Sequence, residues 1–336
     1  MLRHSTDSKP GISRNRQGTG WAYFMADGKR VTNRDEIDRL NAIALPPAYT
    51  DAWFCPDADG HLQATGRDAR GRKQYRYHEH FRAKRDKSKY GDTIEFGAAL
   101  PRLRKQVEAD LRKRSLSRDT VLAAVVRLLD TQHIRIGNEQ YAKENKSFGA
   151  TTLRNRHVKK AGNKLKMRFV GKHGIVHEVA ITDANLKRVV SRCQALPGQN
   201  LFQYVGDDDE PHAVTSTDVN AYIREASGGD FTAKSFRTWG ASVIAFEQLL
   251  ASEEGKRLSV KTIVEPVAEA LGNTVAMSRK SYVHPRLIEA VRDSPRDALG
   301  GLKPPRPRRW LSSAEVGMIA FLKKKPRRKV IAKTTR

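Results

Sequence analysis

SRDTVLAAVVRLLDTQHIRIGN, residues 117–138, has the pattern of a buried helix that ends in a polar segment. Ser117 belongs to the residue types that cap helix N-termini, and the apolar side chains after it recur at helical spacing. They are Val121, Leu122, Val125, Leu128 and Leu129. We therefore expect a helix in the core of a domain, with Arg135 just beyond its C-terminal end.

The residues that follow this helix predict a small sheet and then more helices. Apolar and polar residues alternate over residues 165–170 and again over residues 175–179, as in two strands. Residues 171–174, Gly-Lys-His-Gly, lie between these runs and suit a four-residue hairpin turn. Residues 151–158 also alternate, and this predicts a further strand. Helical patterns resume after residue 184, and the longest begins near Thr232 and runs to about Leu250.

The N-terminal part of the chain has a different texture. Short apolar runs alternate with Pro, Gly and Asp turn signals up to about residue 95, after which Leu103, Val107 and Leu111 form a helical stripe. The sequence therefore predicts the α+β class, with an N-terminal β-rich domain and a mainly α-helical domain that contains a small β-hairpin sheet. The expected boundaries are 1–97 for the first domain, 98–298 for the second and 299–336 for a basic C-terminal tail.

The composition points to a polyanionic partner. The 336 residues include 63 Lys and Arg against 37 Asp and Glu, a net charge of +26, and such an excess repels itself unless an anion neutralises it. No apolar run reaches the roughly 18 residues of a membrane span, and we expect no membrane association and no signal peptide. With only Cys55 and Cys193, a disulfide framework and a cysteine-based zinc site are excluded, and a reducing compartment fits.

The positive charge is concentrated in three clusters. Residues 72–89 interleave basic residues with aromatic ones, residues 102–118 form a second cluster, and residues 301–336 hold 12 Lys and Arg against Glu315 alone. A single charge run is also typical of a solvated face or a solubility tail. Three clusters with interleaved aromatics favour nucleic acid, whose phosphates would dominate the affinity. Four prolines interrupt the last cluster, so we expect a mostly flexible arm with one short helix at most, over residues 311–322.

Motifs that would indicate nucleotide or metal chemistry fail. Residues 66–71 have the glycine spacing of a phosphate-binding loop, but Arg72 and Lys73 follow where Lys and then Ser or Thr are required. The acidic run at residues 207–210 lies between a glycine and a proline, as a solvated loop does, and the ten histidines show no metal spacing. We therefore expect no metal, no nucleotide and no other cofactor.

A phosphodiester can be cleaved without a metal if side chains supply three kinds of group. Arginine suits the charge that develops on the non-bridging oxygens, because its fork is always charged and fits two phosphate oxygens. Tyrosine can be the nucleophile where nearby cations lower its pKa from about 10. Lysine can protonate the leaving oxygen where neighbouring cations lower its pKa.

Five segments of the second domain occur in a fixed order and together resemble the catalytic domain of type IB DNA topoisomerases, in particular the small poxvirus-like bacterial group. They are HIRIGNEQYAKEN (133–145), TTLRNRHV (151–158), FVGK (169–172), FTAKSFRTWGA (231–241) and LGNTVAMSRKSYVHP (271–285). Upstream, GRDARGRKQYRYHEHFRAKRDKSKY (66–90) resembles the N-terminal DNA-contacting segment of that group. The resemblance covers about residues 20–290.

The resemblance implies a role for each matching residue of the catalytic domain. Tyr282 would be the nucleophile, which leaves a 3′-phosphotyrosine link and a free 5′-hydroxyl. Arg135 and Arg237 would hold the non-bridging oxygens of the transition state, and Lys172 would protonate the leaving 5′-oxygen. Lys234, one turn before Arg237, would be a further cation near the phosphate.

Four more residues carry expectations from the resemblance. Asn273 stands where the poxvirus enzymes have histidine, and an amide can still donate a hydrogen bond to a phosphate oxygen although it carries no charge. Gln74, Tyr75 and Tyr77 would touch DNA from the N-terminal domain.

The implied activity is ATP- and metal-independent relaxation of supercoiled double-stranded DNA, by transient cleavage of one strand, rotation and religation. The two domains would close around the duplex as a C-shaped clamp, in a monomer that works in the cytoplasm at the nucleoid. One alternative is a site-specific tyrosine recombinase, which uses similar chemistry but a helical N-terminal domain. A second is a DNA-binding protein with an inactive core.

Overall fold

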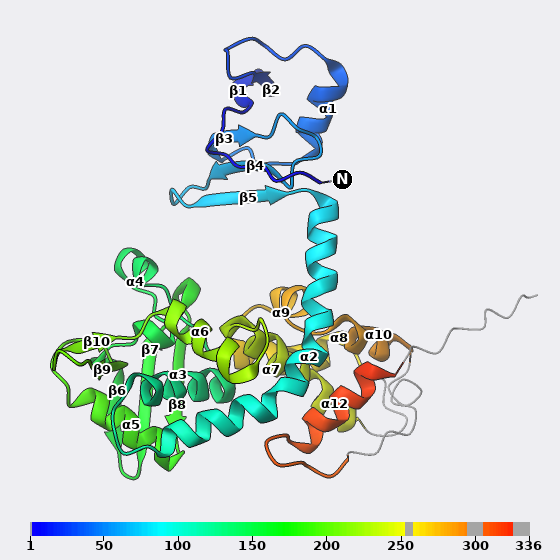
Figure 1. Cartoon of the computed structure of the whole chain (residues 1–336). Helices are drawn as coiled ribbons and strands as arrows, with labels where there is room; N and C mark the ends of the chain where they lie inside the picture. The colour runs from blue at the N-terminus through cyan, green and yellow to red at the C-terminus, as the bar shows by residue number, and fades with distance from the viewer. Residues whose placement is uncertain (1, 253–257, 294–304, 325–336) are drawn as a thin grey trace, which may run out of the picture. The chain divides into compact units, whose positions relative to one another are not determined.

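The structure, a computed structural model, describes residues 2–252, 258–293 and 305–324 (Figure 1). The chain divides into two compact units, Met1–Lys89 and Tyr90–Arg336. The division falls inside the long helix α2 (Glu79–Arg112), on the N-terminal side of the boundary at residue 97 that the sequence predicts.

Unit 1 contains two small antiparallel sheets and one short helix. Its elements are β1 (Ser13–Gln17), β2 (Gly20–Phe24), α1 (Arg34–Ala42), β3 (Thr50–Phe54), β4 (Leu62–Arg67) and β5 (Lys73–Tyr77). Strands β1 and β2 pair as a hairpin, and β3, β4 and β5 form the second sheet in that order. Phe54 lies in the core with no exposed surface, and the ring of Tyr23 packs edge-on against it. The expected β-rich character is therefore confirmed.

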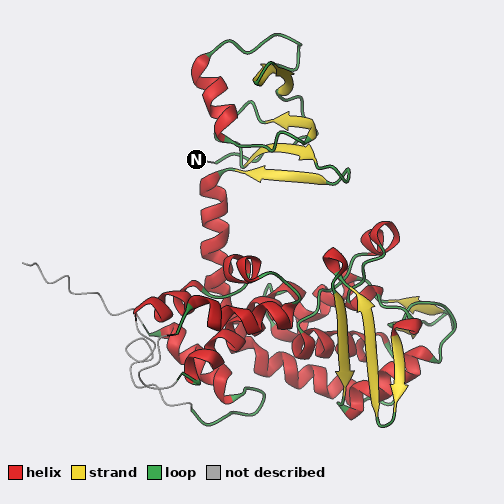
Figure 2. Ribbon diagram, turned by 180° about the vertical axis from the view of Figure 1, so that it is seen from behind, coloured by secondary structure: helices red, strands yellow, loops and turns green. Residues whose placement is uncertain are grey.

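Unit 2 is mainly helical. After α2 its helices are α3 (Arg118–Gln132), α4 (Glu139–Asn145), α5 (Ala184–Gln194), α6 (Ser216–Ser227), α7 (Ala233–Leu250), α8 (Val260–Leu271), α9 (Val275–Ser281), α10 (Pro285–Asp293) and α12 (Ser313–Lys323). Its strands are β6 (Val158–Ala161), β7 (Lys164–Val170) and β8 (Val176–Ile181), which form one antiparallel sheet beside the helices (Figure 2), and the short pair β9 (Gln203–Val205) and β10 (Pro211–Ala213). The α+β class is confirmed.

Helix α3 occupies the middle of this unit, as its sequence predicts. Nearly all of its side chains from Thr120 to Leu129 are buried, because it is covered by α5, α6 and α7. It ends at His133, which adopts the left-handed conformation with φ 51°. The chain therefore turns sharply there, two residues before Arg135.

The strand predicted over residues 151–158 is wrong for all but its last residue. Two short 3₁₀ turns, η1 (Ala150–Thr152) and η2 (Asn155–His157), occupy this stretch, and β6 begins at Val158. The N–H groups of Ala150 and Thr151 donate to the carbonyls of Arg135 and Ile136, at 2.8 and 2.7 Å. The alternating pattern thus belongs to a buried turn that fastens the segment after α3.

The C-terminal segment contains the short helix that the sequence allows over residues 311–322, but this helix is packed on unit 2 and does not belong to a flexible arm. Helix α12 begins at a Ser312 cap and packs on α7, with Met318 fully buried. The Glu315 carboxylate accepts a hydrogen bond of 2.8 Å from the indole of Trp239 on α7. Residues 305–324 are thus part of the unit, because an apolar helix face and a buried carboxylate fix them. Residues 299–304 and 325–336 of the expected tail lie outside the described residues.

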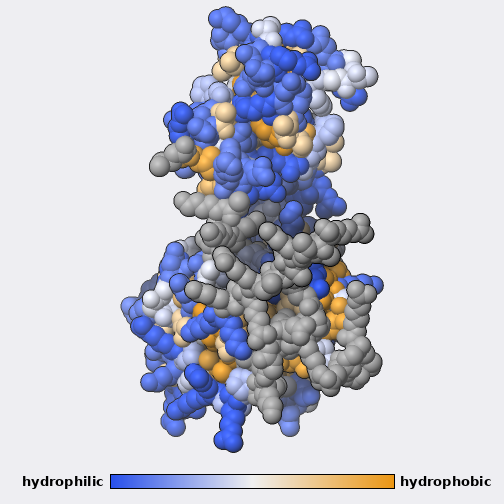
Figure 3. Space-filling model, turned by 90° about the vertical axis from the view of Figure 1, so that its right-hand side faces the viewer, coloured by the Kyte–Doolittle hydropathy of each residue, from blue (hydrophilic) through white to orange (hydrophobic). Residues whose placement is uncertain are grey.

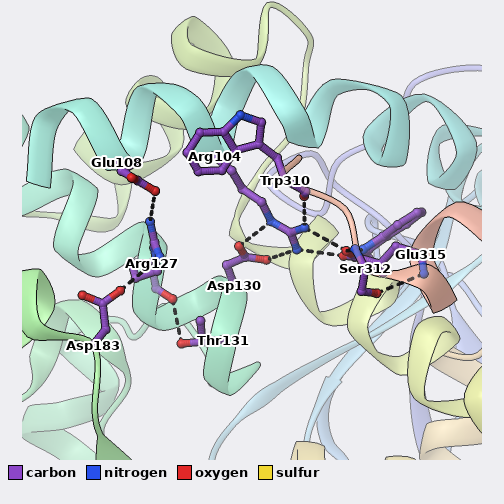
Figure 4. Close-up of polar contacts among 10 residues, drawn as sticks. Arg104, Glu108, Arg127, Asp130, Thr131, Asp183, Trp310, Ser312 and Glu315 are labelled. Atoms are coloured by element: carbon purple, nitrogen blue, oxygen red, sulfur yellow. Dashed lines mark hydrogen bonds and ion pairs between the residues drawn. The ribbon is translucent and has the colours of Figure 1, made fainter. Parts of the chain in front are cut away.

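Arg104 is the centre of the polar network that joins α12 to the rest of unit 2 (Figure 4). Its guanidinium lies 2.8 Å from an oxygen of Asp130 on α3 and 2.8 Å from an oxygen of Glu315 on α12. It also donates to the carbonyl of Trp310 at 2.6 Å. Burial alone would raise the pKa of Glu315, but Arg104 and Trp239 outweigh it and hold that pKa below its usual range. The network therefore links α2, α3, α7 and α12 around one cation.

Glu315→Ala should destabilise unit 2, because it leaves Arg104 with one carboxylate and Trp239 with no acceptor. We expect a loss of about 3 kcal/mol or more in the free energy of unfolding, typical of breaking a buried ion pair. Chemical denaturation followed by circular dichroism measures it. Glu178→Ala is the matched control, since the Arg168–Glu178 pair is 71% exposed on both sides and should contribute less than about 1 kcal/mol. Equal losses in the two variants would contradict this account.

Candidate active site

One cavity of unit 2, about 390 Å³ in volume, collects five of the six catalytic candidates. Arg135, Lys172, Lys234, Arg237 and Tyr282 all line it. They come from the segment after α3, from the turn between β7 and β8, from α7 and from the C-terminal end of α9. The sixth candidate, Asn273, contacts Arg135.

Arg237 ties together the ends of two helices. It lies on α7 and is only 4% exposed. Its guanidinium donates to the carbonyl of His133, after the end of α3, and at 3.1 Å to the carbonyl of Leu271, the last residue of α8. Carbonyls at helix ends lack partners within the helix, so a buried arginine satisfies them while they hold its orientation. Its Nε has no partner among the described residues.

Arg135 is oriented by Asn273. Its Nη2 donates to the side-chain oxygen of Asn273 at 2.7 Å. The amide nitrogen of Asn273 is buried and has no partner among the described residues. A buried donor without a partner is costly and rare in native proteins. The Asn273 side chain therefore uses its oxygen to orient the arginine, and its N–H₂ remains a donor without a partner among the described residues.

The cations of the cavity lack counter-charges. Within residues 2–252, 258–293 and 305–324, no carboxylate lies within ion-pair distance of Arg135, Lys172, Lys234 or Arg237. Two other arginines of unit 2, Arg104 and Arg127, do have carboxylate partners (Figure 4). Four unpaired cations around one cavity make a site for an anion such as phosphate.

Tyr282 is held at the cavity by its backbone. It follows α9 directly, its carbonyl accepts from the hydroxyl of Ser242 on α7 at 3.4 Å, and the next residue, Val283, is fully buried. The guanidinium carbon of Arg237 lies 5.1 Å from the centre of the Tyr282 ring. Helix α7 thus positions both the nucleophile candidate and the arginine beside it.

The electrostatic environment of Tyr282 favours its ionised form. Burial raises the pKa of the phenol, but the positive charges of Arg237, Arg135 and Lys234 outweigh burial and lower that pKa below 10. A lowered pKa makes the phenol oxygen a better nucleophile near neutral pH. This is the effect that the sequence predicts for a tyrosine among cations.

Lys172 lies in the turn between β7 and β8, as expected. The turn is the 3₁₀ segment η3 (Lys172–Gly174), and the N–H of Gly171 closes it by donating to the carbonyl of Ile175 at 2.7 Å. Just before the turn, the carbonyl of Val170 accepts a hydrogen bond from the backbone N–H of Phe148, a residue that lines the cavity. The turn is therefore fastened to the wall of the site.

The N-terminal candidates lie on β5 of unit 1. The ring of Tyr75 is 49% exposed and stacks on that of Tyr77, with centroids 6.2 Å apart. Gln74 donates to a carboxylate oxygen of Asp68 at 3.0 Å, and Asp68 also binds Arg72. A stacked pair of rings, one of them exposed, on a basic strand suits contact with nucleic acid, whereas Gln74 also braces its own hairpin.

Several cavity residues were not singled out by sequence reasoning. Tyr141 on α4 is 45% exposed, and Asn138 caps that helix by accepting from the N–H of Tyr141. Ser147 and Phe148 follow the helix and also line the cavity. Their nearness to Arg135 along the chain is the signal that could have found them.

The described part of the chain contains neither a candidate metal site nor a candidate membrane span. No group of three His, Cys, Asp or Glu residues among them could hold a metal ion. None of the described helices is long and apolar enough to cross a membrane. On the face drawn in Figure 3, hydrophilic side chains cover most of the described surface of both units.

Comparisons with known proteins agree with the motifs. The family model for the catalytic core of eukaryotic DNA topoisomerase I matches residues 78–298, and that for the N-terminal domain of bacterial DNA topoisomerase IB matches residues 20–68. The first match alone covers more than half of the chain. A solved structure of the XerH site-specific recombinase bound to difH aligns over 57% of this chain and 52% of that one, with a TM-score of 0.37 and 13% identity, which supports no conclusion.

Two viral relatives extend over most of the chain. The DNA topoisomerase 1B of Acanthamoeba polyphaga mimivirus is 33% identical over 298 residues, which is 85% of this chain and 88% of that protein. The DNA topoisomerase 1B of Vaccinia virus (strain Copenhagen) is 22% identical over 291 residues, 81% of this chain and 90% of that protein. With the matched catalytic core and the matched N-terminal domain, the chain belongs to the type IB DNA topoisomerases.

Proposed function

We propose that this topoisomerase, which relaxes supercoiled DNA, cleaves one strand by attack of the Tyr282 oxygen on a backbone phosphorus. The observation that carries the proposal is a phenol of lowered pKa at a cavity whose cations have no carboxylate partner in the ranges that the structure describes. A DNA phosphate supplies the missing negative charge. The resulting link is a 3′-phosphotyrosine.

The charge that develops in the transition state falls on the two non-bridging oxygens. Arg135 and Arg237 bind them, and Lys234 adds a third positive charge from the first turn of α7. The free N–H₂ of Asn273 donates to one of these oxygens, since its own oxygen already orients Arg135. Donors fixed in advance in this way stabilise a transition state without having to reorganise.

Lys172 supplies the proton for the leaving group. The bond between Tyr282 and phosphorus forms while the bond from phosphorus to the 5′-oxygen breaks, and the Lys172 ammonium gives its proton to that oxygen. The phenol proton goes to solvent. Religation is the reverse reaction, so the bond energy kept in the phosphotyrosine makes ATP unnecessary.

The DNA path in this proposal uses both units. Tyr75, Tyr77 and Gln74 contact the duplex from unit 1, and the two units close around it as a C-shaped clamp while the free 5′-end rotates. The stacked rings of β5, of which Tyr75 is exposed, and the cations of unit 2 that have no carboxylate partner among the described residues support this arrangement. We further propose that the chain acts as a monomer on the DNA of the cytoplasmic nucleoid.

The recombinase alternative shares the cleavage chemistry but has a helical N-terminal domain. Here unit 1 holds two small sheets, and its residues 20–68 match a domain of bacterial topoisomerase IB. These observations favour relaxation over recombination.

The purified chain should relax supercoiled plasmid in EDTA without ATP, and Tyr282→Phe should abolish both relaxation and the covalent DNA adduct. The variant should still bind DNA, because affinity comes from basic surface rather than from the phenol. Plasmid gels, denaturing gels of the adduct and a binding titration measure the three properties. An adduct formed by the Phe variant would rule out Tyr282 as the nucleophile.

Lys172→Ala should slow cleavage by about 10²–10⁴, the usual contribution of a positioned acid. Replacing the bridging 5′-oxygen by sulfur should restore most of the rate, since a thiolate leaves without a proton. Single-turnover cleavage of the two substrates measures this. Arg135→Ala is the control that sulfur should not rescue, because its partner is a non-bridging oxygen. If sulfur fails to rescue Lys172→Ala, the acid must be sought elsewhere, first at Lys234.

Asn273→Asp distinguishes the role of the amide oxygen of Asn273 from the role of its N–H₂ group. The carboxylate can still accept from Arg135, but it cannot donate to phosphate and it repels it. We expect cleavage to slow by about 10²–10³, as for the loss of one transition-state donor, with Asn273→Ala also slow. Asn273→His should keep relaxation within about tenfold, because imidazole can both accept and donate. Single-turnover cleavage rates of the three variants test this. An Asp variant that cleaves as fast as the parent chain would show that Asn273 does not donate to the phosphate.

A further inference from the structure

His177 on β8 sits between two segments of the active site. A Cβ on Gly171, next to Lys172, would lie 2.7 Å from atoms of the His177 ring. A Cβ on Gly272, next to Asn273, would lie 2.8 Å from the same ring. Both glycines therefore pack directly against the imidazole, which fills the space between the Lys172 turn and the junction of α8 with α9.

The ring is fixed from behind by the sheet. His177 pairs with Phe169 of β7, and their rings stack with centroids 5.1 Å apart and 16° between the planes. Phe169 is buried in the core of unit 2. The imidazole is thus held by a rigid element, and the turn that it touches joins the ends of β7 and β8.

The charge state of His177 suits this packing role. Burial, followed by the charges of Arg135 and Arg237, holds the pKa of the imidazole below 6.5. The ring is therefore neutral near pH 7 and adds no further cation beside the two arginines. It packs as an aromatic wedge.

We propose that His177 is a positioning residue that sets where the Lys172 turn stands relative to Asn273 and the phosphate. The inference rests on the proposed function, in which Lys172 delivers the proton to the 5′-oxygen. Proton transfer requires hydrogen-bond distance between donor and leaving oxygen, and the wedge fixes one wall of the turn that carries the donor. Without the ring, the turn can collapse toward Gly272 or swing away from it.

The test measures single-turnover cleavage by full-length His177→Ala on DNA with oxygen or sulfur at the bridging 5′ position. With oxygen we expect cleavage to slow by up to about 10², the usual effect of a misplacement near 1 Å, with unchanged DNA affinity. With sulfur the rate should return to near that of the parent chain. His177→Phe should retain most of the activity with oxygen, because it keeps an aromatic wedge on Phe169.

Gly171→Ala changes the same contact from the side of the turn, and it provides a second test if His177→Ala folds poorly. The backbone of Gly171 has φ −92°, which any residue adopts, so the added methyl acts through its contact with the ring. It should also slow cleavage with oxygen and be rescued by sulfur. His212→Ala is the matched control, since that histidine is exposed and pairs with Asp208 outside the cavity.

The outcomes separate this inference from the proposed function. If sulfur rescues Lys172→Ala but neither His177→Ala nor Gly171→Ala, His177 does not act through the lysine and the inference is overturned alone. If sulfur rescues none of the three variants, Lys172 is not the general acid, and the inference about His177 is overturned together with that assignment. Full activity of His177→Ala on ordinary DNA would also overturn the wedge.

Discussion

Two arginines that have no carboxylate partner in the described part of the chain determine how the candidate active site of this topoisomerase is built. Arg237 is buried against the carbonyls of His133 and Leu271, and Arg135 is held by the oxygen of Asn273. Carbonyl and amide oxygens orient a guanidinium without neutralising it. Both arginines therefore keep their charge available to an anion, which in the proposed reaction is a DNA phosphate, and the same charges lower the pKa of Tyr282 against the effect of its burial.

Holding such charges without counter-ions requires a rigid surrounding. The segment after α3 is fastened by the backbone of residues 150–151, and α7 carries Lys234, Arg237 and the serine that binds the backbone of Tyr282. Behind α7, Trp239 donates to Glu315 of α12, and Glu315 binds Arg104. The paired charges of that network stabilise the helices from which the unpaired charges project.

The sequence predicted the elements with strong periodicity and the residues within specific motifs. The buried α3 and the turn of Lys172 between β7 and β8 follow from local pattern, and the structure confirms both. The strand predicted over residues 151–158 is wrong for all but its last residue, because the alternation there reflects the burial of a turn that packs on the segment after α3. The short helix that the sequence allows over residues 311–322 is present as α12, but its packing on unit 2 was not predicted, because charge counting cannot show that Glu315 has a buried partner. The contact of His177 with two glycines exists only once three segments meet.

The most direct test of this account is to map the covalent adduct. The chain has nine tyrosines, and Tyr282 lies at the cavity with a pKa that the surrounding cations lower. DNA should be trapped on the protein with a substrate that cannot religate, the complex digested with a protease, and the nucleotide-bearing peptide sequenced by mass spectrometry. The account predicts a single modified residue, Tyr282, joined to a 3′-phosphate. Modification of another tyrosine, or attachment through a 5′-phosphate, would contradict it.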